Sequence, residues 1–187
     1  MRRLVLGSLA AGVAMWLVGF IFWSPLLSWI PLAAIPDGNA QIVQQALAAN
    51  LGPLGSGTYA IPSATTTAGT VLQANGPVAV VHFTNSGFPA LDSVSLIWGM
   101  VLAMGCAFAG ALGLRMLPGL GYAERIRLVA FFAIGVAGYA DLSQPVFNHV
   151  PWGYFIYLLV SHVLTWLAGG AVLARFMDDP EPPPEYD

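Results

Sequence analysis

Four long apolar runs dominate the hydrophobic pattern of this chain. A helix rises 1.5 Å per residue, so about 20 apolar residues cross the roughly 30 Å hydrocarbon core of a bilayer. The runs predict transmembrane helices at residues 1–23, 93–114, 128–147 and 152–176. The first run follows Met1-Arg2-Arg3, which leaves a cleaved signal peptide as the alternative. We favour an uncleaved helix, because the run exceeds the about 7–15 residues usual in signal peptides and ends in Phe22-Trp23 rather than in small residues.

Residues 24–92, between the first and second runs, follow a different pattern and contain no Arg or Lys. Apolar residues recur at helical spacing over residues 42–51, after Asp37, a residue type that caps helix N-termini. Two runs rich in β-forming residues follow, Thr58–Ile61 and Val78–Phe83, and they could pair as a two-stranded ribbon. The expected fold class is therefore an all-α membrane protein with four transmembrane helices and a small α+β extracytoplasmic cap between the first and second.

All six basic residues of the chain are arginines, and their positions predict its orientation. An even number of spans puts the two termini, the loop at residues 115–127 and the tail at residues 177–187 on one side, and every arginine then lies on that side. The arginines are Arg2, Arg3, Arg115, Arg125, Arg127 and Arg175. Because cytoplasmic segments carry an excess of Arg and Lys, we expect a multi-pass protein of a bacterial inner membrane with cytoplasmic termini.

Composition excludes several classes of protein. Hydrophobic residues make up 57% of the chain and charged residues 8%, against about 25% charged residues in soluble domains. No cluster of basic residues indicates nucleic-acid binding, and the single cysteine, Cys106, excludes an intrachain disulfide or a cysteine metal cluster. Motifs for hydrolysis, phosphate binding and dinucleotide binding are absent, so we predict no catalytic residue and no metal site.

The net charge of −3 comes largely from the tail, whose acidic, proline-rich sequence is typical of disorder.

Small residues recur every four positions along the second predicted span. One series consists of Gly105, Ala109 and Gly113, and the other of Gly99, Ala103, Ala107 and Ala111. Small residues at this spacing let helix backbones approach closely within a membrane. The first series predicts a helix-packing face. Two interpretations of that face stay open, contact with another subunit and ordinary packing within this chain.

Asp141 is the only acidic residue, and His162 the only histidine, within the four predicted spans. Asp141 lies fourteen residues beyond Arg127 and His162 thirteen residues before Arg175, so both sit about 20 Å above the level of those arginines. The third and fourth spans share a short connection, which predicts antiparallel neighbours. We therefore predict an intramembrane polar pair, linked directly or through water, that holds the two helices in register. If Pro145 ended the third helix early, Asp141 would instead be solvated at the interface.

The positions of the three histidines do not favour a cofactor held between spans. His82, His149 and His162 lie at different predicted depths, so no two of them can hold a haem between spans. We predict no cofactor. A haem or chlorophyll bound through His162 alone is the alternative to a histidine that is hydrogen-bonded inside the bundle.

Three short stretches of the chain form a recognisable series. They are GVAMWLVG at residues 12–19 with aromatic residues following, GTYAIP at residues 57–62, and Gly76-Pro77 ahead of a β-like run. Through these stretches the chain resembles a group of small bacterial membrane proteins whose function is not established. The resemblance covers most of the chain. It implies a bacterial origin and a four-span layout, and it implies no activity.

The expected function is non-enzymatic. Small-residue faces, few polar groups within the spans and the lack of catalytic motifs favour an accessory or structural subunit of a larger membrane complex. Such a protein would contact membrane lipids and either other membrane-protein subunits or copies of itself. The alternative is a protein that binds a cofactor or handles protons or a small solute through Asp141, His149 and His162, since ionisable residues within a membrane are usually functional. A sensor that uses the cap is a third class.

Overall fold

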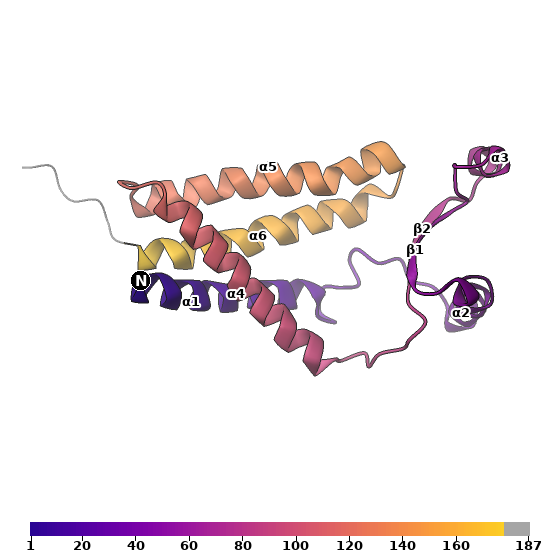
Figure 1. The fold of residues 1–187 in the computed structure, drawn as a ribbon, viewed down its shortest axis with the longest axis horizontal. Coiled ribbons are helices and arrows are strands. Elements are labelled where there is room, and N and C mark those ends of the chain that lie inside the picture. Colours follow the sequence, from indigo (N-terminus) through magenta and orange to yellow (C-terminus); the bar gives the residue numbers. More distant parts are fainter. Residues whose placement is uncertain (178–187) are drawn as a thin grey trace, which may run out of the picture. The chain divides into compact units, whose positions relative to one another are not determined.

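Four long helices form the frame of the computed structural model, which describes residues 1–177 (Figure 1). They are α1 (Arg2–Trp23), α4 (Ser93–Arg115), α5 (Tyr122–Asn148) and α6 (Trp152–Phe176). Each is long and apolar enough to cross a membrane. A two-stranded sheet lies between α1 and α4 in chain order, which confirms the predicted fold class. The expectation for the acidic tail concerns residues 178–187, which lie outside the described residues.

The helices pack unevenly around α6. Helix α6 lies between α1 and α5 and packs along both, whereas α4 packs along α1 and contacts α6 over a short stretch (Figure 1). Helices α4 and α5 barely touch each other. The four helices therefore do not close into a complete bundle, and residues 1–177 cover α4 on one side only.

Small residues let α1 approach α4 and α6 closely. A Cβ added at Gly12 would lie 2.5 Å from the Cα of Met104, and one added at Gly169 would lie 2.6 Å from the Cγ of Met15. Ala107, on α4, is fully buried in the same core. Apolar side chains gain little by leaving lipid for protein, so helices in a membrane associate through close van der Waals contact of this kind. Gly12 and Gly169 thus set the spacing of the helices.

Aromatic residues attach α6 to the end of α1 and to the loop that follows it. The Tyr157 hydroxyl donates to the Phe22 and Leu27 carbonyls, which lie at or beyond the end of α1 where helical donors run out. The Tyr157 ring also packs edge-on against Phe22 and Trp23. The four long helices belong to one compact unit, named here the helical unit. Residues 24–33, which the sequence predicts as the start of the cap, belong to this unit as well, and the Tyr157 contacts help to explain why.

Helix α5 begins at Tyr122, within the loop that the sequence predicts at residues 115–127. The Glu124 carboxylate accepts a hydrogen bond of 2.8 Å from the Gly121 N–H, and a carboxylate in the first turn also favours the helix dipole. The predicted loop is therefore too long, and Arg125 and Arg127 are helical. At its other end α5 runs through Pro145 to Asn148.

The cap, residues 34–92, forms a compact unit of its own. It contains α2 (Asp37–Leu51), the 3-10 turn η1 (Gly52–Leu54), β1 (Gly57–Ile61), α3 (Thr67–Asn75) and β2 (Ala79–Phe83). The strands pair antiparallel with Tyr59 opposite Val81, which confirms the predicted ribbon. In α2 only Leu51 is buried, and Ile42 is 66% exposed, so the apolar face of this helix is not covered by the described residues.

Two helix starts in the cap differ from expectation. The N-cap of α2 is Pro36, and Asp37 is instead the first helical residue, where its charge favours the helix dipole. Helix α3 forms in Thr- and Ala-rich residues that the hydrophobic pattern leaves unassigned. The Thr66 hydroxyl caps it by accepting from the Gly69 N–H at 3.0 Å. Glycine is required at position 69, because a Cβ there would lie 1.8 Å from the Ser63 carbonyl oxygen.

Candidate functional site

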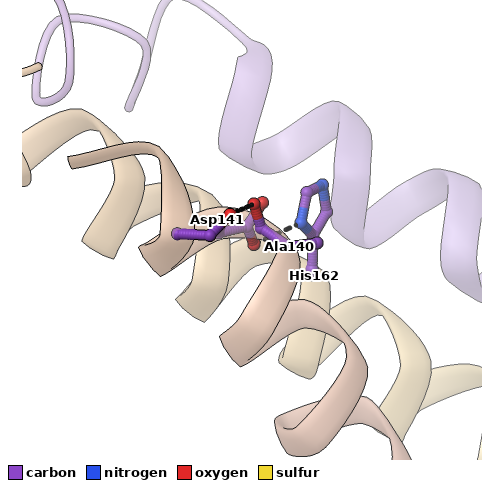
Figure 2. A network of polar contacts seen from close by, with 4 residues as sticks. Ala140, Asp141 and His162 are labelled. Carbon is purple, nitrogen blue, oxygen red and sulfur yellow. Dashed lines mark hydrogen bonds and ion pairs between the residues drawn. The ribbon is translucent and has the colours of Figure 1, made fainter. Parts of the chain in front are cut away.

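Asp141 and His162 are in direct contact. His162 Nδ1 lies 2.8 Å from Asp141 Oδ2, and Figure 2 shows the His162 ring of α6 beside the carboxylate of α5. An ionised carboxylate can only accept a hydrogen bond, so Nδ1 carries the proton and donates in that state. The structure thus brings the two residues together without an intervening water.

Four-residue spacing on α5 explains why Asp141 lies in the helix contact. The buried residues Ala133, Ala137, Asp141 and Pro145 share one face of α5. Pro145 lacks the N–H that would bond the Asp141 carbonyl four residues earlier, yet the helix continues to Asn148. The alternative in which α5 stops early and Asp141 is solvated at the helix end is therefore wrong.

The two partners differ in exposure. The Asp141 side chain is 9% exposed and the His162 side chain 47% exposed. A carboxylate removed from water is costly unless it is hydrogen-bonded, and His162 supplies that bond. The second ring nitrogen, Nε2, makes no hydrogen bond within residues 1–177. His162 therefore hydrogen-bonds the Asp141 carboxylate through Nδ1, and its Nε2 can form a hydrogen bond with another group.

His162 opens onto an apolar groove of about 620 Å³ between α4, α5 and α6, named here the α4–α5 groove. From α4 it is lined by Gly110, Gly113 and Leu114, and from α6 by Trp166 and His162. The α5 lining includes Val129, Phe132 and Val136. Asp141 and His162 are the ionisable residues among those that line it. Small-molecule sites commonly measure about 300–1,000 Å³ and combine an apolar lining with a few polar groups, so the groove has the size and character of such a site.

The other two histidines lie elsewhere. His149 is exposed and ends α5 in the left-handed conformation with φ 54°, eight residues after Asp141 and thus about 12 Å farther along the helix. His82 lies in the cap, where its Nδ1 is 2.9 Å from the Thr58 hydroxyl. Over residues 1–177 no three His, Cys, Asp or Glu residues could hold a metal ion. The structure therefore joins His162, and not His149, to Asp141.

The two small-residue series of α4 have different surroundings. Ala107 and Ala111 are fully buried, whereas Gly105, Ala109 and Gly113 are exposed. A Cβ added at Gly105 or Gly113 would meet no atom within 4 Å. Packing within this chain uses the second series, so the intrachain interpretation of the first series is wrong. Contact of that series with another subunit stays a prediction.

An arginine cluster at one end of the four long helices is not evident from the sequence, in which the arginines indicate only orientation. A cavity of about 350 Å³ at the start of α1 and the ends of α4 and α6 is lined in part by Arg3, Arg115 and Arg125. Arg125 is 5% exposed, and its Nη1 donates to the Ala174 carbonyl at 3.4 Å. The burial of Arg125 could have been predicted from helical spacing, because this residue lies eight positions before Ala133 on the buried face of α5.

Comparison with known proteins identifies no relative of this chain. No protein-family model, curated protein or solved structure matches this chain. The resemblance to small bacterial four-span proteins therefore stays an expectation, and the candidate site rests on geometry.

Proposed function

We propose that this protein is a non-enzymatic accessory or structural subunit of a larger assembly in a bacterial inner membrane. The observation that carries the proposal is the open face of α4 at Gly105, Ala109 and Gly113. Residues of this size and spacing let a second helix approach closely, and within residues 1–177 no helix covers them. A partner subunit or a second copy of the chain would supply the missing contact.

The arrangement of α4 supports the same proposal. The helix packs against α1 through its opposite face, and it barely touches α5. Leu102, three residues before Gly105 and on the same face, is 68% exposed. A partner helix on this face would cover α4 from both sides.

The arginines support the proposed orientation, with both termini in the cytoplasm and the cap outside. Arg3, Arg115 and Arg125 come from three different helices and line one cavity. They therefore lie at one end of the helical unit, as a single headgroup level requires. Excess arginine marks the cytoplasmic side of a membrane protein.

Photo-crosslinking in native membranes tests the partner contact. A photoreactive phenylalanine analogue at Leu102 is expected to give a crosslinked product of discrete mass, either twice the 19.7 kDa of one chain or that of a heterologous partner. Introducing Gly105→Leu into the same protein should abolish that product, because the added side chain prevents close helix approach. A product that persists at equal yield in the Gly105→Leu variant contradicts the proposal.

Tyr139 provides a matched control position for the probe. It is 77% exposed on α5 and lies twelve residues after Arg127, about the same height as Leu102, which lies thirteen residues before Arg115. Probes at the two positions therefore sample lipid at a similar depth. We expect no discrete product from Tyr139, and equal products from both positions would indicate random collisions in the membrane.

A second candidate function, binding of a small molecule, is favoured by the position of Asp141 and His162 in the α4–α5 groove. A proton path across the membrane would need further polar groups or water along its length. The rest of the groove lining is almost wholly apolar, and His149 is separate from the pair. The geometry therefore favours ligand binding over proton transfer as the role of the pair.

A further inference from the structure

We propose that the α4–α5 groove binds an uncharged lipid-soluble molecule of the quinol and quinone class, with its polar head at His162 and its apolar tail along α5. This site is additional to the proposed subunit contact. Gly110, Gly113 and Leu114 line the groove, which therefore adjoins the open face of α4 at Gly113, whereas Leu102, Gly105 and Ala109 do not line it. A ligand in the groove and a partner on the open face of α4 can therefore be tested separately.

The chemistry of the head follows from the hydrogen bond of His162. With Nδ1 donating to ionised Asp141, a neutral ring presents Nε2 as an acceptor for a ligand hydroxyl. A protonated ring presents Nε2 as a donor to a ligand carbonyl. Asp141 holds the ring in one orientation in both states. Hydroxyl and carbonyl oxygens on a ring are the polar groups of quinols and quinones.

The lining of the groove indicates that the ligand is uncharged. No arginine lines the groove, so a phosphate or a porphyrin carboxylate would lie there without a cation and at high desolvation cost. His162 also lies about 20 Å from the arginine level, which leaves about 10 Å to the far edge of a 30 Å hydrocarbon core. A charged lipid headgroup stays at the membrane surface, but an uncharged ring can enter to this depth.

The length of the groove indicates an extended tail. The lining residues on α5 run from Leu128 to Asp141, which are thirteen positions apart and therefore span about 20 Å of helix. Val129, Phe132 and Val136 provide an apolar wall along that length. A compact solute at His162 would leave most of the groove empty, whereas an alkyl or isoprenoid chain would follow it.

Ring-nitrogen NMR tests the head contact directly. The full chain, labelled with ¹⁵N in its three histidines, would be placed in lipid nanodiscs and titrated anaerobically with decylubiquinol, then with decylubiquinone. We expect the His162 ring nitrogens to shift, while those of His82 and His149 stay unchanged. His162→Gln identifies the signal by its loss.

Two tryptophan variants test the path of the tail. Val136→Trp adds bulk inside the groove, and Ile134→Trp adds similar bulk on α5 outside the groove lining. Val136 is 68% and Ile134 54% exposed, so the larger side chain has room at either position. Displacing two or more buried CH₂ groups is expected to weaken binding at least about tenfold in Val136→Trp. Ile134→Trp should bind as the unaltered protein does.

Several outcomes overturn the site. They are an unshifted His162, equal losses in the two tryptophan variants, or the same His162 shift with phosphatidylglycerol alone. A tetrapyrrole absorption spectrum in the purified protein would assign His162 to a metal instead. Gly105→Leu should leave the quinol-induced shift unchanged, so failure of the ligand site and failure of the subunit contact give different results.

Discussion

Asp141 and His162 stabilise each other, because replacing either one removes the charge-assisted hydrogen bond that joins them across the helix contact. We expect Asp141→Asn and His162→Gln each to destabilise the helical unit by about 1–2 kcal/mol. The double variant should lose less than the sum, with a coupling energy of about 0.5–2 kcal/mol. Reversible unfolding in mixed micelles measures all four free energies. Additive losses would show that the two side chains share no interaction.

The contact between these residues could be predicted from counting along the helices. Arg127 and Arg175 mark one level, and similar residue numbers then bring Asp141 and His162 to one height. The exposure of His162 could not be predicted in this way. It depends on α4 diverging from α5, and no local pattern in either helix specifies that crossing.

At the scale of elements, the two faces of α4 should respond differently to the same change of residue. Gly12→Leu inserts a side chain where Met104 already lies, and overpacking of this kind costs about 1–3 kcal/mol or more. Gly105→Leu meets open space within the chain, and leucine favours helix more than glycine does. Thermal unfolding of the monomer in detergent should therefore show a lower midpoint for Gly12→Leu and no loss for Gly105→Leu. Equal losses would place a helix of this chain on the Gly105 face.

The helices themselves were predictable, but their partners were not. Apolar length and charge fix the spans to within a few residues, except where the Gly121–Glu124 bond starts α5 early. The two small-residue series of α4 have identical spacing, so spacing alone cannot say which one faces α1. That choice depends on complementary shapes such as Met104 against Gly12. In α5, by contrast, the four-residue spacing of Ala133, Ala137 and Asp141 does indicate the face that packs, because these residues form the buried face of the helix.

At the scale of the whole molecule, both functional proposals depend on one layout. The depth of His162, the neutral character of its ligand and the access of a membrane partner to α4 all require the four apolar helices to cross the bilayer. They also require the arginine-bearing ends to share one side. Residues 34–92, without Arg or Lys, then lie on the opposite side.

Reporter fusions measure this layout directly. Alkaline phosphatase, which is active only outside the cytoplasm, and green fluorescent protein, which fluoresces inside it, would each be fused after Pro62 and after Asp187. Four spans with cytoplasmic arginines predict phosphatase activity only at Pro62 and fluorescence only at Asp187. Phosphatase activity at the carboxyl terminus would contradict the four-span orientation, and with it the depth assigned to Asp141 and His162.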